Sequence, residues 1–256
     1  DPVTNLPTLS ASIKPREKPE YLEKALSILV SYSKKQKLLV VFDEFQEVAK
    51  YSEEGFEKRL RKVIQGHQNI SYIFSGSQKH ILIEMFDSAK RAFYKMARSY
   101  PLENIEMQHY VNWAQKLFKK KKVNVDKEII TDIVERCDYQ PMYIQQFLFD
   151  LWRSETVTLA DLDKIQKSII VSQKNQFIVL WDLLTQNQKK ALWLMAETGG
   201  EGIYAAEQLQ RVGFNSGSVL QRALKSLVEK EILSKNGTFQ FQDAMLKKWV
   251  QSFSYS

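Results

Sequence analysis

LLVVFDEFQE, residues 38–47, is the stretch that decides the fold of this chain. Its first five residues, Leu38–Phe42, are apolar and have the length of a buried strand, and two adjacent carboxylates, Asp43 and Glu44, follow directly. Charged groups are costly to place beside a buried element, so paired acids at this point serve function more often than stability. The stretch therefore predicts a buried strand that ends in a functional site.

Adjacent carboxylates after a buried strand suit the chemistry of nucleotide hydrolysis. One carboxylate can hold Mg²⁺ while its neighbour orients or deprotonates the attacking water. Asp43 and Glu44 thus fit the pattern of a Walker B strand. Its usual companion is missing, because no G-x-x-x-x-G-K-[ST] phosphate loop occurs in the 256 residues.

Composition indicates a globular, helix-rich protein. A chain of 256 residues with 44% hydrophobic residues can form more than one domain, and few glycines (9) and prolines (6) favour helices with short connections. No apolar run approaches the ~20 residues of a membrane span, and the first residues do not form a signal peptide. The single cysteine, Cys137, cannot form an internal disulfide. We therefore expect a soluble, cytoplasmic protein without a membrane partner.

The net charge of +7 would suit a polyanion, but the lysines are spread along the chain. The densest cluster, Lys119–Lys122, closes an amphipathic segment, where basic residues complement the helix dipole. A solvated helix end is the preferred interpretation, and a phosphate site is the alternative.

The first part of the chain reads as helix, strand, helix, strand. A helix is expected over 19–35 beginning at Pro19, and a second over 53–66; the strands are Leu38–Phe42 and Ile70–Phe74. Both strands are nearly all apolar, which predicts a parallel sheet covered on both faces.

Polar residues follow the second strand as well, at Ser75 and Ser77. Ligands bind at the carboxyl ends of parallel strands, so adjacent strands would place these serines near Asp43 and Glu44. The alternative is a strand-to-helix turn with a serine cap.

The remainder is helical until a predicted hairpin near the end. Four helices are expected within 105–182. A capping box at Thr185 and Gln188 opens three more, and Asn236-Gly237 is a strong hairpin-turn signal. Three helices followed by a hairpin predict a winged helix-turn-helix. The expected domains are 1–104, 105–182 and 183–256.

Five segments in order carry a resemblance to a known family. The chain resembles the archaeal-type ATPases and their bacterial relatives in the signal-transduction (STAND) branch of AAA+ ATPases, without the N-terminal Walker A part. The resemblance implies an α/β plus all-α fold: the remnant of a parallel-sheet P-loop NTPase core, a helical lid domain and a C-terminal winged helix. The matching segments are VVFDEFQEV, YIFSGSQKH, KRAFYKMARSYPLENI, CDYQPMYIQQFL and FQDAMLKKWV.

The resemblance also implies site roles, with ATP and Mg²⁺ as cofactors. Asp43 would hold Mg²⁺ through water and Glu44 would be the general base. Ser75 and Ser77 would sense the γ-phosphate, aided by Gln46. Lys95 stands where the family has the arginine of Tyr-Gly-Arg, and Tyr139-Gln140-Pro141 replaces a Gly-x-Pro turn.

The resemblance implies a missing partner too, namely the N-terminal phosphate-loop segment. Without that backbone cradle we expect the isolated chain to be inactive, and the intact protein to act as a nucleotide-dependent switch. Two alternatives stay open: a non-catalytic scaffold with a decayed nucleotide site, and DNA binding by the winged helix. DNA or a protein partner would contact Gln221, Arg222 and Lys225.

Overall fold

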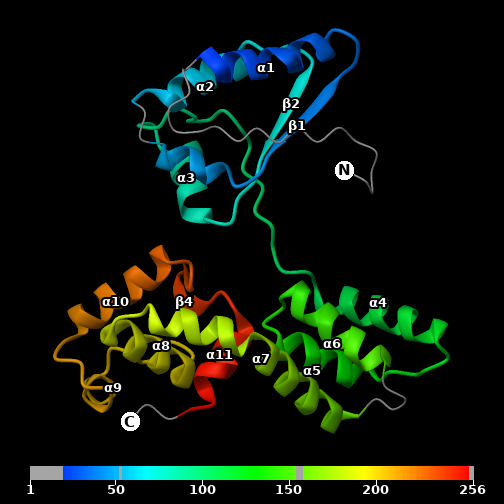
Figure 1. The fold of residues 1–256 in the computed structure, drawn as a ribbon, viewed down its shortest axis with the longest axis vertical. Coiled ribbons are helices and arrows are strands. Elements are labelled where there is room, and N and C mark those ends of the chain that lie inside the picture. The colour runs from blue at the N-terminus through cyan, green and yellow to red at the C-terminus, as the bar shows by residue number, and fades with distance from the viewer. Residues whose placement is uncertain (1–19, 52–53, 154–157, 254–256) are drawn as a thin grey trace. The chain divides into compact units, whose positions relative to one another are not determined.

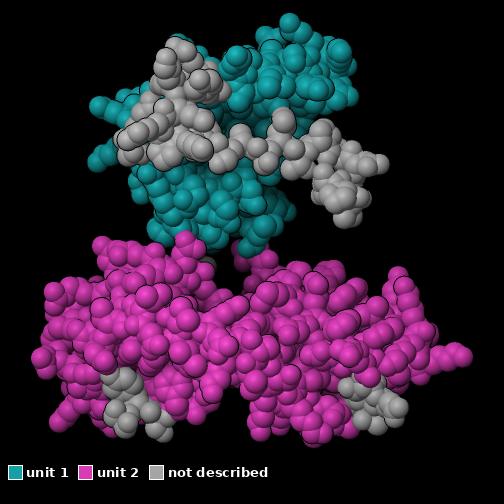
Figure 2. Space-filling view, viewed as in Figure 1, with its two compact units in different colours: residues 1–102 teal, residues 103–256 magenta. Residues whose placement is uncertain are grey.

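The computed structural model describes residues 20–51, 54–153 and 158–253, which form two compact units (Figure 1). Unit 1 comprises residues 1–102 and unit 2 comprises residues 103–256 (Figure 2). Pro19, the expected first residue of the first helix, lies outside the described residues. The division into three domains at 104 and 182 stays a prediction.

Unit 1 contains a two-stranded parallel sheet with helices. Strands β1 and β2 pair in register from Leu38 opposite Ile70 to Phe42 opposite Phe74, so the predicted strand bounds are confirmed. The helix expected over 53–66 begins three residues later than predicted, after Gly55 in a left-handed conformation (φ 78°). The elements are α1 (Glu20–Ser33), β1 (Leu38–Phe42), the 3₁₀ helix η1 (Phe45–Lys50), α2 (Phe56–Gln65), β2 (Ile70–Phe74) and α3 (Lys79–Asp87).

One face of this sheet is packed and the other is exposed. Phe42, Tyr72 and Phe74 pack against a core built of Leu26, Phe45, Leu60, Ile64 and Met85 from the helices and Phe93 from the loop after α3. On the opposite face Leu39, Val41 and Ile73 are 63%, 55% and 47% exposed. The expectation of a sheet covered on both faces is therefore wrong for the described residues. Apolar residues at alternate positions face away from these helices, and no described element of unit 1 buries them.

Unit 2 is helical apart from one hairpin. Its elements are α4 (Met107–Lys120), α5 (Lys127–Arg136), α6 (Pro141–Arg153), α7 (Leu159–Asp182), α8 (Gln186–Thr198), α9 (Ala206–Arg211), α10 (Gly217–Glu229), β3 (Leu233–Asn236), β4 (Thr238–Phe241) and α11 (Ala244–Gln251). The capping box is confirmed, since Gln188 N donates to Thr185 Oγ1 (3.3 Å) and Thr185 N donates to Gln188 Oε1 (2.9 Å). The antiparallel hairpin is confirmed as well, with Gly237 at φ 76° between its strands.

A single hydrophobic core runs through unit 2. It includes Ile133 of α5, Phe147 of α6, Leu192 of α8 and Met245 of α11. The long helix α7 packs against α6 on one side and α11 on the other, so it joins the first helices to the last ones (Figure 1).

Candidate functional site

The two strands of unit 1 end side by side, and this brings the predicted site residues together. Backbone bonds extend the ladder past the strands, from Ser75 N to Phe42 O and from Phe45 N to Ser75 O, both 2.8 Å. Asp43 and Glu44 after β1 therefore lie next to Ser75 and Ser77 after β2. The register, not any local propensity, produces this arrangement.

Each serine bonds one of the carboxylates. Ser75 Oγ donates to Asp43 Oδ1 (2.9 Å), and Ser77 Oγ donates to Glu44 Oε2 (3.1 Å). The expectation that the serines stand near the acids is confirmed, while the roles of all four residues stay predictions. Asp43 Oδ1 also accepts from the backbone N of Glu44 (3.0 Å), which fixes the orientation of that carboxylate.

Glu44 is held by its neighbours in a defined position. Its backbone is left-handed (φ 50°, ψ 41°), and its Oε2 accepts from the amide Nε2 of Gln46. Hydrogen bonds from Gln46 and Ser77 keep the pKa of the Glu44 carboxyl below its ordinary value. Glu44 is therefore ionised at neutral pH and can accept a proton or orient a water.

The donor set fits a magnesium ion shared with a phosphate ligand. Mg²⁺ prefers oxygen ligands and is commonly held by one or two carboxylates together with water and substrate phosphates. Asp43 and Glu44 are both exposed at the strand ends and offer such oxygens. Across the described ranges, no group of three or more His, Cys, Asp or Glu side chains could hold a metal ion. Asp43 and Glu44 therefore offer the type of oxygen ligand that Mg²⁺ prefers.

The structure does not bring Lys95 into this group. Its backbone N donates to Phe86 O (2.8 Å), and its Nζ lies 5.2 Å from the centre of the Tyr94 ring. Within the described part of unit 1, no hydrogen bond or ion pair joins Lys95 to Asp43 or Glu44.

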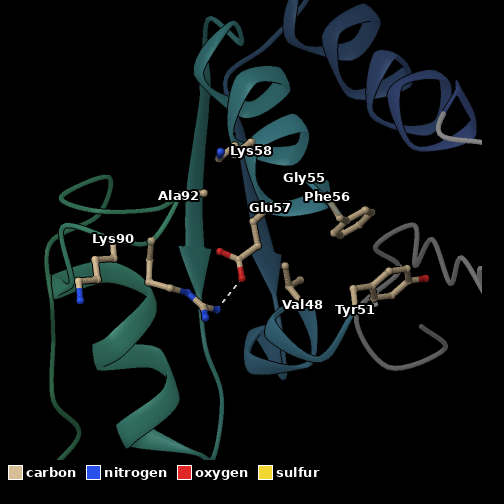
Figure 3. Close-up of a pocket in the computed structure, with 9 residues that line it drawn as sticks. Val48, Tyr51, Gly55, Phe56, Glu57, Lys58, Lys90 and Ala92 are labelled. Carbon is tan, nitrogen blue, oxygen red and sulfur yellow. Dashed lines mark hydrogen bonds and ion pairs between the residues drawn. The ribbon is translucent and has the colours of Figure 1, made fainter. Parts of the chain in front are cut away.

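A shallow hollow of about 260 Å³ lies elsewhere on unit 1 (Figure 3). In this hollow the rings of Tyr51 and Phe56 stack with their centroids 4.4 Å apart, and the guanidinium of Arg91 forms an ion pair with Glu57 Oε1 (2.5 Å). Arg91 also bonds Glu84 (3.3 Å), so its charge is matched inside the protein. None of the predicted site residues lines this hollow.

The turn that leads into Tyr139-Gln140-Pro141 has a backbone conformation typical of glycine. Asp138 and Tyr139 have φ of 46° and 59°, although neither is a glycine. Tyr139 N donates to Val134 O (3.1 Å), and Gln140 Nε2 donates to Gln242 O (2.9 Å). The turn is therefore engaged with the wing end of unit 2, a role that its sequence did not indicate.

The winged-helix residues predicted to meet DNA or a protein lie on the exposed face of α10. Gln221, Arg222 and Lys225 are all exposed. Lys225 Nζ lies 3.9 Å from Glu229 Oε1, which offsets part of its charge. The face is available for a contact and only weakly basic.

Comparisons with known proteins agree with this fold. Residues 164–252 match a family described as a probable winged helix domain. The chain is similar to the solved structure of the Walker-type ATPase PABY2304 of Pyrococcus abyssi, with 16% identity over 95% of this chain and 72% of that chain and a TM-score of 0.67. No curated protein matches.

Two structures of the Aeropyrum pernix ORC2 protein are also similar, each at 16% identity over 94% of this chain. The ADP form has a TM-score of 0.45 with 71% of that chain covered. The form with ADPNP and ADP has a TM-score of 0.40 with 72% covered.

The fold class follows from these observations together. The chain is mostly helical, with a small parallel sheet, a fold like that of P-loop ATPases and a C-terminal winged helix domain. Among the described residues, no helix combines the length and apolar character needed to cross a membrane.

Proposed function

We propose that this chain is the C-terminal portion of a cytoplasmic ATP-binding AAA+ ATPase of the STAND branch. The observation that carries the proposal is the pairing of Ser75 with Asp43 and of Ser77 with Glu44 at the ends of adjacent parallel strands. That edge of a parallel sheet is where such folds bind nucleotide. The similarity to a Walker-type ATPase supports the same assignment.

Each side chain has a separate task in the proposed reaction. Asp43 would hold Mg²⁺ through water, and the ion, when bound, supplies positive charge for the phosphate oxygens. Glu44, ionised, would orient the attacking water and take its proton. Ser75 and Ser77 would donate hydrogen bonds toward the terminal phosphate, and Gln46 would keep Glu44 in place. In the part of the chain that the structure describes, Lys95 does not contact the carboxylates; a role for it would need the chain to move, and it would then supply a single positive charge without the bidentate geometry of arginine.

In this proposal the phosphate loop would come from a further segment, because the 256 residues contain none. The exposed apolar face of Leu39, Val41 and Ile73 supports such a partner, since exposed apolar groups of this kind mark interaction surfaces. Nucleotide held between that segment and the carboxylates would favour one arrangement of the two units, and hydrolysis would release it.

Two measurements test the proposal. Titration of this chain with a fluorescent ATP analogue should show no saturable binding at micromolar concentrations; micromolar affinity would contradict the expected inactivity. In the intact ATPase, Glu44→Gln should retain ATP binding and reduce turnover by about 10²–10⁴-fold. Glu47→Gln is the matched control, because Glu47 is exposed and pairs with Lys50 instead. Unchanged turnover in Glu44→Gln would reject Glu44 as the base. ATP binding without any turnover in the unsubstituted protein would favour the alternative of a non-catalytic scaffold.

The winged helix suggests a second candidate function, a contact made through α10. We favour a protein partner for this face, because Glu229 offsets the charge of Lys225 and leaves Arg222 as the main cation. DNA is the alternative. A gel shift at two salt concentrations separates them, because binding to DNA weakens steeply with salt while a neutral protein contact does not.

A further inference from the structure

Gly76 lies between the two site serines, in contact with Gln46. A Cβ atom added at Gly76 would lie 1.9 Å from Gln46 Oε1 and 3.0 Å from Gln46 Cδ. Atoms at 1.9 Å overlap, so the amide of Gln46 occupies the volume that any other residue at position 76 would need.

The backbone does not require glycine at this position. Gly55, Gly199 and Gly237 are among the glycines with positive φ, and Gly76 is not. An alanine could therefore adopt the same backbone conformation. Apart from Gln46, the nearest atom to the added Cβ is Leu82 Cδ1 at 3.2 Å. Space for the Gln46 side chain is the reason that glycine is needed.

The Gln46 amide is held where it lies by the site itself. Gln46 is 2% exposed, and its Nε2 donates to Glu44 Oε2 and lies 3.5 Å from Ser77 Oγ. Its Oε1 is buried and has no hydrogen-bond partner among the residues that the structure describes. Leaving a buried oxygen without a partner is unfavourable, so the amide does not take this position for the sake of its own oxygen. The hydrogen bond from Gln46 Nε2 to the charged Glu44 carboxylate is strengthened by that charge, and it holds the amide in place.

We infer that Gly76 is a positioning residue of the carboxylate site. Its missing side chain leaves room for the Gln46 amide, and that amide holds the Glu44 carboxylate beside Ser77. The inference deepens the proposed function and rests on it for its meaning in hydrolysis. The arrangement itself can be tested on this chain without nucleotide.

The test is Gly76→Ala, read through the side-chain amide of Gln46 in NMR spectra. The Gln46 signal is assigned by its loss in Gln46→Ala. In the unsubstituted protein this buried, hydrogen-bonded amide should exchange slowly with solvent. The Gln46 amide is the end of a flexible side chain. The methyl group that Gly76→Ala introduces should therefore displace the amide without unfolding unit 1. We expect its exchange to become on the order of tenfold faster or more.

Gly66→Ala is the matched control. Gly66 also lacks a positive φ, and a Cβ added there would meet nothing closer than Val63 O at 3.5 Å. It should leave the Gln46 signal unchanged. A Gln46 signal with unchanged shift and exchange in Gly76→Ala would overturn the inference.

A double-mutant cycle separates Gln46 from the nearby Leu82. Hydrogen exchange of the β1 and β2 amides reports the stability of unit 1 in each variant. The loss of unit 1 stability caused by Gly76→Ala should largely disappear in the Gln46→Ala background, because no amide is left to displace. An equal cost in both backgrounds would assign the clash to Leu82 and reject the inference. If both results hold but Gly76→Ala leaves turnover of the intact ATPase unchanged, the role proposed for Glu44 in hydrolysis fails and the positioning role stands.

Discussion

The hydroxyl of Tyr143 in α6 lies 2.9 Å from each carboxylate oxygen of Asp243, which caps α11. Asp243 Oδ1 also accepts from the backbone N of Met245 and of Leu246, both at 2.8 Å. Tyr143 is 1% exposed, so this contact lies inside unit 2. One buried hydroxyl thus connects the helical part of unit 2 to the last helix of the winged helix.

Loss of this hydroxyl should destabilise unit 2. Tyr143→Phe keeps the ring and removes a buried hydrogen bond to a charged group, which costs about 1.5–3 kcal/mol of unfolding free energy. Urea unfolding followed by tryptophan fluorescence measures it, because all five tryptophans lie in unit 2. Tyr204→Phe is the control, since Tyr204 also lies in unit 2, is 48% exposed and should change the free energy little. Equal midpoints for the two variants would show that the contact contributes nothing.

The Cys137 thiol should be inert while unit 2 is folded. Burial, with a smaller contribution from the nearby charge of Asp138, raises the pKa of Cys137 to about 12. The thiolate is the reactive species, so at pH 8 its fraction falls by about 10³-fold relative to an ordinary cysteine. Labelling with a chromogenic disulfide reagent should be slow in buffer and fast in urea above the unfolding midpoint. Rapid labelling in buffer would contradict the buried position.

Acidification should weaken unit 1 through His67. Burial lowers the pKa of His67 below its ordinary value of 6.5, and its Nδ1 lies 2.5 Å from Tyr72 Oη in the packed face of the sheet. The unfolded chain therefore binds a proton at His67 more readily than the folded chain does. The stability that neutral His67 contributes is present above about pH 6.5 and is lost as the pH falls through the lower pKa that His67 has in the folded protein.

The measurement is hydrogen exchange of the β2 amides at pH 7.5 and 5.5, corrected for the intrinsic exchange rate. The loss of stability on acidification should be smaller in His67→Gln than in the unsubstituted protein. His109→Gln is the control, since the His109 side chain is 73% exposed and lies in unit 2. The same pH dependence in all three proteins would exclude His67 as the source.

Alanine in the hairpin turn should weaken the wing through the backbone alone. Gly237 has φ 76°, and an added Cβ would meet nothing within 4 Å. Gly237→Ala should therefore cost about 1–2 kcal/mol from the left-handed conformation, and Gly237→Asn should cost less. The tryptophan-detected unfolding of unit 2 measures both. An alanine cost near zero would mean that the turn changes its conformation to accept it.

Local patterns were enough to predict much of the fold. Both strands of unit 1 were predicted to the residue, because short, mostly apolar runs bounded by polar residues leave little choice of ends. The Thr185 capping box and the hairpin at Gly237 depend on neighbouring residues only, and both are present. The proximity of the serines to the carboxylates could also be predicted, since parallel strands end at one edge.

Tertiary structure decided what depends on distant atoms. Gln46 and Gly76 are 30 positions apart, and their contact depends on how the chain turns after each strand. Tyr143 and Asp243 are 100 positions apart, and no periodic pattern links them. The exposed sheet face was missed because an apolar strand reads the same whether or not another element covers it. The sequence by itself therefore determined the strands, the caps and the acidic pair, which depend on short-range chemistry. Packing decided which side chain holds Glu44, because packing is a property of the folded chain as a whole.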